Sequence, residues 1–243
     1  MIQATVRHHL TRDDAQLVAR LIARDSGKPL EEIEQTLSDR GIDAVLDDPR
    51  LPGALLRAGQ GACASFPLFA YVMVRHALRR LGEDDRRLAD YVAAVMTHFG
   101  VRDNAHRISA SDDQLYDTLA ALLADVDDPD GRRSFLVRAH LGNYALWLSG
   151  LFPDHVEHRR WRRGGPDLDY YEEMGRRGFQ LAAGHRLADD HGLATLFTTA
   201  AERFGLLRAA LNDVSDALLF PDRHSPERLM RQVMSESRWR RLS

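Results

Sequence analysis

The sequence predicts an all-α fold, a compact multi-helix bundle of nine or ten helices. Apolar residues recur along the chain at spacings of three and four, the spacing of one helix face. Residues that cap helices begin these runs, and glycine or proline ends them. No segment shows the convincing alternation of apolar and polar residues that marks a half-buried strand.

The composition is that of a soluble globular protein. The chain has 243 residues, of which 44% are hydrophobic and 28% are charged. This length and composition suit one large helical domain, 1–243. Within it, residues 1–60 are expected to form a sub-layer that packs on a core bundle of residues 61–243. The longest apolar run is too short for a membrane span of about 20 residues. The single cysteine, Cys63, is interpreted as a small buried side chain. We expect a cytoplasmic protein without a membrane partner.

The first 60 residues are predicted to contain short helices. Thr11 is a good N-cap for the first one, and Lys28-Pro29 starts a second that ends at Gly41. Pro52-Gly53 predicts a turn, after which another short helix begins. These helices would form the sub-layer.

The helix expected over 66–81 lies at the centre of the predicted fold. Ser65 can cap it, and its apolar side chains point in every direction, as in a helix that is buried on all sides. Arg75 is interpreted as one of the cations that suit the negative C-terminal end of the helix dipole. A further helix should begin after Glu83 and end at Gly100.

The rest of the chain is predicted to be helical beyond a looser segment at 101–110, the best candidate for a seam between domains. The expected ranges are 111–126 with a capping box at its start, 132–152, 168–188, 193–220, and a final helix that starts at Ser225-Pro226. Because 193–220 contains no proline, it should form one helix of about 42 Å. The helices near 66–81, 132–152, 168–188 and 193–220 are expected to be the central ones.

The stretch HRRWRRGGPDLDYYEEMGRRGF, residues 158–179, combines basic and aromatic residues in an unusual way. Four arginines flank one tryptophan: Arg159, Arg160, Trp161, Arg162 and Arg163. From 157 to 177, six arginines face five acidic residues, so one interpretation is a solvated corner whose charges pair across the Gly164-Gly165 bend. The alternative is a contact with a protein or an anionic ligand.

The C-terminal stretch SRWRRLS has a similar composition with fewer opposing charges. From 222 to 243 there are six arginines and three acidic residues. Trp239, Arg240 and Arg241 are therefore a second candidate surface for an acidic partner. The competing interpretation is a basic terminus that complements the dipole of the last helix.

A ligand pocket is the second kind of candidate site. Its expected residues are Tyr144, Tyr171, Gly175, Gly178 and His185. Gly175 and Gly178 lie inside a predicted helix, where each costs about 1 kcal/mol relative to alanine. They favour a tight crossing with the helix near 134–152 or the helix at 193–220, or else a ligand that lies on the bare backbone.

No cofactor or metal is predicted. His185 with Asp189, and Asp154 with His158, stand four residues apart, but the Glu-x-x-His pattern of di-iron bundles is not in the sequence. Nor are a phosphate-binding loop, a dinucleotide fingerprint or a serine nucleophile elbow.

Charge argues against a nucleic-acid partner. The formal net charge is −3, whereas nucleic-acid-binding domains usually have a basic excess. Residues 11–40 could form a helix-turn-helix, but three glutamates on its second helix would face the phosphates.

The sequence favours a non-catalytic helical protein that acts through protein–protein association, with a protein partner or with itself as a homo-oligomer. The alternative is a helical-bundle enzyme or small-molecule binder with a pocket near Gly175 and Gly178, in a metal-dependent or a metal-free form. The sequence leaves open whether the protein is an enzyme.

Overall fold

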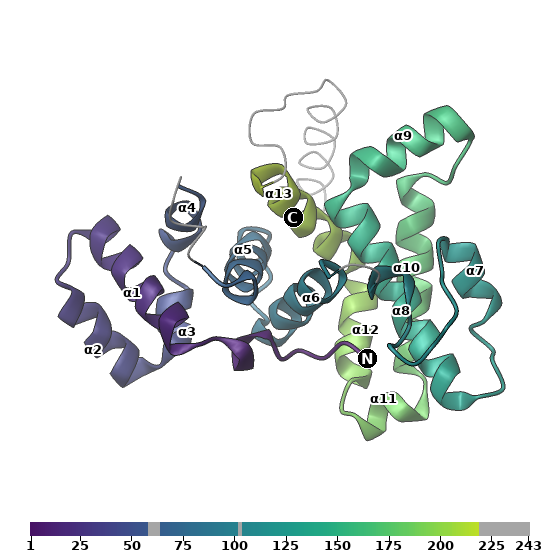
Figure 1. Ribbon diagram of the computed structural model, residues 1–243, viewed down its shortest axis with the longest axis horizontal. Helices are drawn as coiled ribbons and strands as arrows, with labels where there is room; N and C mark the ends of the chain where they lie inside the picture. The colour runs from purple at the N-terminus through teal and green to yellow at the C-terminus, as the bar shows by residue number, and fades with distance from the viewer. Residues whose placement is uncertain (58–63, 102–103, 219–243) are drawn as a thin grey trace.

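The computed structural model of the chain describes residues 1–57, 64–101 and 104–218. All regular elements in these residues are helical, which confirms the predicted all-α fold. Thirteen α-helices are present there, nine of them with at least seven residues (Figure 1). Their bounds are α1 Arg12–Ser26, α2 Leu30–Arg40, α3 Ile42–Leu46, α4 Leu51–Leu56, α5 Phe66–Arg80, α6 Arg86–Phe99, α7 Leu119–Ala124, α8 Gly131–Leu151, α9 Pro153–Arg163, α10 Leu168–Ala183, α11 Arg186–Asp190, α12 Ala194–Glu202 and α13 Phe204–Leu218. Single 3₁₀ turns lie at Val6–His9 and Asn104–His106.

The helix α8 is the hub of the larger part of the molecule. It packs along α10 and crosses α13, while α12 covers another face of α10. The helices α5 and α6 form a pair beside them, and α13 connects this pair to α8. The helices α1 to α4 form a group at one end of the molecule (Figure 1), joined to α5 and α6 by α4 and by the turn at Val6–His9.

Several predicted helix starts are confirmed by their caps. The hydroxyl of Thr11 accepts a hydrogen bond from the amide of Asp14, whose carboxylate accepts one from the amide of Thr11. Ser65 caps α5 in the same way, through the amide of Leu68. As expected, α5 is buried on almost all sides: all of its residues from 70 to 78 are buried.

The predicted single helix over 193–220 is wrong. It breaks at Arg203 into α12 and α13, although no proline stands there. The two halves bury their apolar faces on different neighbours, because α12 packs on α10 and α13 packs on α8 and α5. The fully buried ring of Phe204 sits at the break.

The predicted helix over 111–126 is also wrong, since only Leu119–Ala124 is helical and Thr118 caps it. Acidic residues within and just after this range pair with α8 instead. The guanidinium of Arg133 on α8 pairs with Asp112 at 3.1 Å and with Asp128 at 2.6 Å. The buried side chain of Tyr116 also accepts a hydrogen bond from Arg133, so this segment is held in an irregular form.

Two further boundaries differ from expectation. The stretch 168–188 is α10 followed by the separate α11, because the chain leaves the helix at Gly184. Pro52 and Gly53, expected in a turn, lie within the first turns of α4, where a proline loses no hydrogen bond.

Candidate functional site

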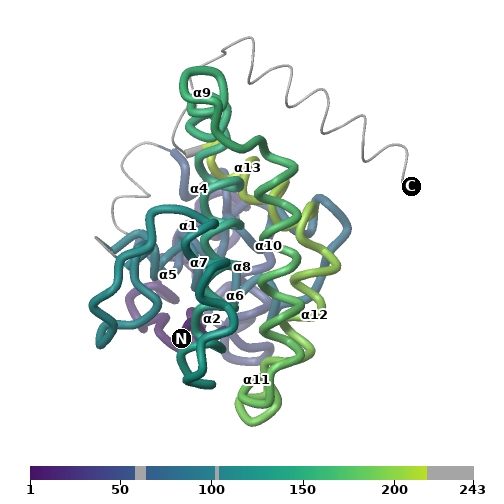
Figure 2. Tube along the Cα trace, turned by 90° about the vertical axis from the view of Figure 1, so that its right-hand side faces the viewer, coloured from purple at the N-terminus to yellow at the C-terminus, as the bar shows by residue number. Residues whose placement is uncertain are grey.

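The helix α9 carries the arginine cluster and projects from one end of the molecule (Figures 1 and 2). Pro153, expected to end the preceding helix, is the first residue of α9. Gly164 ends α9 with φ of +64°, a conformation that glycine adopts without strain. Only Pro153 and Val156 are buried among its eleven residues, so α9 offers most of its surface to the outside.

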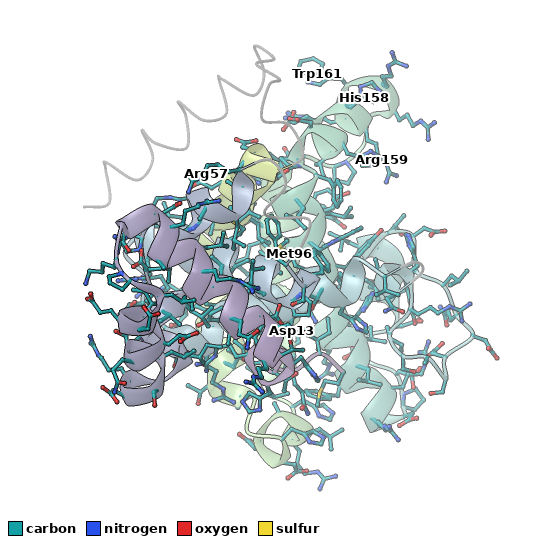
Figure 3. All side chains as sticks on the ribbon, turned by 60° about the vertical axis from the view of Figure 1, so that its left-hand side comes forward. Asp13, Arg57, Met96, His158, Arg159 and Trp161 are labelled. Atoms are coloured by element: carbon teal, nitrogen blue, oxygen red, sulfur yellow. The ribbon has the colours of Figure 1, made fainter. Side chains whose placement is uncertain are left out.

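Trp161 is the most exposed large apolar side chain among the described residues, with 81% of its surface accessible. Figure 3 shows Trp161, His158 and Arg159 on the outer part of α9. Tryptophan buries a large apolar area when it enters a partner's pocket, and it is enriched with arginine at the energetic centres of interfaces. Because this indole is exposed, the monomer does not gain the hydrophobic free energy of burying it. A partner that covers the ring would gain that free energy on binding.

The charges of the cluster are mostly unpaired within the part of the chain that the structure describes. Arg160 and Asp167 face each other across the Gly164-Gly165 bend with 3.9 Å between nitrogen and oxygen, so the expected pairing is present once. No ion pair joins Arg159, Arg162 or Arg163 to a carboxylate of the described residues. The second candidate surface, with Trp239, Arg240 and Arg241, lies outside the described residues, as does Cys63.

The glycines of the predicted ligand pocket lie in tight helix contacts. A Cβ atom at Gly178 would stand 2.5 Å from the backbone nitrogen of Gly142 on α8. One at Gly175 would stand 2.1 Å from the ring of Phe204. The neighbouring helix α8 and the start of α13 therefore occupy the space beside both glycines. This arrangement is the tight helix crossing, the first of the two alternatives that the glycines favoured.

The aromatic residues of the same set lie near this crossing. Tyr144 is almost fully buried and stacks on His140 and Trp147, with ring centroids 6.0 and 6.1 Å away. Burial raises the pKa of Tyr144 to about 12 and also raises the pKa of Tyr171. Burial lowers the pKa of His140 to about 4, against the effect of its hydrogen bond with the Ala105 carbonyl. All three side chains are therefore neutral near pH 7.

His185 is separated from the other pocket residues. It caps α11, where its Nδ1 accepts a hydrogen bond from the amide of Leu187, and its ring stacks on Phe135 at 5.2 Å. Burial, followed by the charges of Arg138 and Arg186, lowers its pKa. In the described residues, no three histidine, cysteine or acidic side chains are placed to hold a metal ion.

A groove with a volume of about 350 Å³ opens between α10 and α12. Its walls are Gln180, Ala183, Gly184, Thr198, Ala201 and Glu202. Glu202 is the one ionisable residue in this wall, and a catalytic site normally brings several such groups together. The groove does not include any residue of the predicted pocket.

Sequence reasoning missed a network of charges around the buried Arg75, between the α1–α4 group and the pair α5 and α6. Arg75, assigned to the exposed end of the helix dipole, is fully buried. Its Nε donates to Asp47 at 3.0 Å, and Arg86 donates to the same carboxylate at 2.6 Å. Burial opposes the ionisation of Asp47, but the hydrogen bonds from Arg75 and Arg86 lower its pKa. The signal in the sequence was an arginine on a helix that is apolar all round, since such a charge must be paired.

Comparison with protein-family models, curated proteins and solved structures gave no match for this chain. In the described part of the chain, none of the helices combines the length and the apolar character needed to span a bilayer.

Proposed function

We propose that the protein is non-catalytic and acts through protein–protein association, with α9 as its docking helix. The exposure of Trp161 carries this proposal: an 81% accessible indole at the projecting end of the molecule is an anchor without a pocket of its own. The tyrosines and glycines of the rival pocket are used in packing around α8 and α10, which gives the pocket hypothesis less support.

The charge of α9 selects the chemistry of the partner. Arg159, Arg160, Arg162 and Arg163 outnumber the two acidic residues of this helix, Asp154 and Glu157. The planar guanidinium group binds carboxylates through two parallel hydrogen bonds. The preferred partner is therefore a protein that presents carboxylates around an apolar pocket for Trp161.

Replacement of all four arginines of α9 by serine should weaken partner binding at least tenfold and leave the melting temperature nearly unchanged. Their side chains make one long ion pair within the described residues, and surface pairs of this kind contribute about 0–1 kcal/mol. The measurement is quantitative capture of proteins from an extract of the source cells on the immobilised chain. A candidate partner then has to be purified and its dissociation constant determined.

A matched control removes the same charge elsewhere. Arg12, Arg20, Arg40 and Arg132 are exposed and outside α9, so their replacement by serine should leave binding unchanged. If both variants lose binding equally, net charge and not α9 is responsible. If neither loses it, α9 is not the docking surface.

The same variants also test whether the partner is a second copy of this chain. The helix α2 exposes Glu31, Glu32 and Glu34 at the end of the molecule far from α9 (Figure 1), and two copies could pair these surfaces head to tail. Light scattering after size-exclusion chromatography should then show oligomers for the wild type and monomers for the α9 variant. Binding to a labelled oligonucleotide at 150 mM salt that is lost in the α9 variant would contradict the protein-partner proposal.

A further inference from the structure

The buried histidine His140 joins the middle of α8 to the 3₁₀ turn at Asn104–His106. Only 5% of its surface is accessible. Its Nε2 lies 2.9 Å from the carbonyl oxygen of Ala105 in that turn. A carbonyl oxygen can only accept, so Nε2 carries the hydrogen of the neutral ring, and a second proton would have to go to Nδ1.

Aromatic rings surround this imidazole. The ring of Phe99 on α6 lies 5.2 Å away, and the ring of Tyr144, one turn further along α8, stacks on it at 6.0 Å. The turn lies against the same row of rings, because His106 packs on the edge of Tyr144 at 6.0 Å and Ala105 is itself buried. While the turn is in place, a charge on the imidazole would have little water to solvate it.

The titratable groups that face His140 do not compensate such a charge. They are His98 of α6, His106 of the turn and the amino group of Met1, and a positive charge on any of them disfavours one on His140. Asp117 lies 3.2 Å from Nδ1 of His106 and is 82% exposed, so its carboxylate serves His106. Burial first, and then these neighbours, lower the pKa of His140 to about 4.

The other buried histidine of the described residues, His76, has a different environment. Its Nε2 also lies 2.9 Å from a backbone carbonyl, that of Leu46. Burial lowers the pKa of His76 as well, but the carboxylate of Asp47 acts in the opposite direction. No carboxylate of the described residues is among the main influences on His140.

We propose that the contact between His140 and the Asn104–His106 turn is an acid-sensitive switch. When the ring takes up a proton from the solvent, the turn separates from α8, water reaches the imidazolium, and the ring of Tyr144 loses part of its cover. The switch is separate from α9 and does not rest on the proposed function.

The direction of the effect follows from the proton that the open form binds. In the open form the ring is solvated and takes up a proton below about pH 6.5, whereas in the closed form it stays neutral until about pH 4. The contact is therefore at full strength above about pH 6.5 and weakens as the pH falls toward 4.

Amide hydrogen exchange of Tyr116 measures this opening. Its amide donates to the carbonyl of His106 at 2.8 Å, so it should exchange when the turn separates. After correction for the intrinsic exchange rate, its protection should fall by about 20-fold between pH 6 and pH 4.5. The amide of Tyr144 in α8 should keep its protection over this range. An equal loss at both amides would mean that the whole chain unfolds, which would overturn the proposal.

The variant His140→Gln keeps a donor for the Ala105 carbonyl but takes up no proton in this range. The protection of the Tyr116 amide should lose most of its dependence on pH in this variant. The matched control is His76→Gln, which removes the other buried histidine and should retain the dependence of the wild type. If His140→Gln retains it too, His140 is not the switch.

A second measurement needs only the wild type, so it also decides the case if His140→Gln fails to fold. The ring proton resonances of His140, followed by nuclear magnetic resonance, should stay those of a neutral imidazole from pH 7 down to about pH 5. A titration midpoint near about pH 6.5 with the turn still protected would show that the ring is charged in the closed form. That result would rule out the switch.

Discussion

Gly178 is the residue at which α8 and α10 approach most closely among the contacts described above. A Cβ there would meet the backbone of Gly142, 2.5 Å from its nitrogen and 3.1 Å from its Cα. Backbone cannot move aside as the end of a flexible side chain can, so both helices would have to shift. The absence of a side chain at Gly178 thus fixes the distance between the two longest helices of the described chain.

The variant Gly178→Ala should lower the free energy of unfolding by about 1–3 kcal/mol, because overpacking outweighs the better helix propensity of alanine. Urea denaturation followed by circular dichroism measures it. Gly184→Ala is the matched control on the same segment, since its Cβ would meet nothing closer than the Gln180 carbonyl oxygen at 3.7 Å. If Gly178→Ala leaves the stability unchanged, α8 and α10 do not cross this closely. The alternative of a ligand that lies on the glycine backbone would then be favoured again.

At the scale of elements, Arg133 determines the conformation of the segment before α8. Its guanidinium group contacts three carboxylates and the hydroxyl of Tyr116. It replaces the missing helical hydrogen bonds of this segment with side-chain contacts. The segment should therefore depend on Arg133 more than α8 does, because α8 is buried against α10 and α13.

The variant Arg133→Gln should increase amide hydrogen exchange over residues 112–125 and leave the protection of α8 unchanged. Exchange followed by mass spectrometry of peptides from both regions measures this. Arg132→Gln, at the exposed neighbouring position, serves as control and should not alter exchange in either region. Equal protection of 112–125 in both variants would show that Arg133 is dispensable there.

At the scale of the molecule, α5 and α6 connect the α1–α4 group to the bundle around α8. Asp47 at the end of α3 receives hydrogen bonds from Arg75 of α5 and from Arg86 of α6. Arg75 is fully buried, so detachment of the α1–α4 group would take away one of the carboxylates that compensate its charge, which is unfavourable. The α1–α4 group is therefore expected to stay attached while the bundle around α8 is folded.

The prediction of a single domain over 1–243 is tested by the cooperativity of unfolding. Pulse-labelled hydrogen exchange along a urea series should give the same midpoint for peptides of α1 and of α8, since a single domain unfolds in one transition. A lower midpoint for α1 alone would divide the chain into two units. In that case the sub-layer at 1–60 would be a domain of its own.

The sequence by itself determined the helical class and many helix ends, because apolar spacing and caps such as Thr11 and Ser65 act within a few residues. It also singled out Trp161 and its arginines by composition alone, although their role stays a prediction. Tertiary structure decided the break at Arg203, the irregular course of 111–118 and the burial of Arg75. Each of these depends on a partner that is distant in the chain, such as Arg133 for Asp112, and local propensity is too weak to outweigh such contacts.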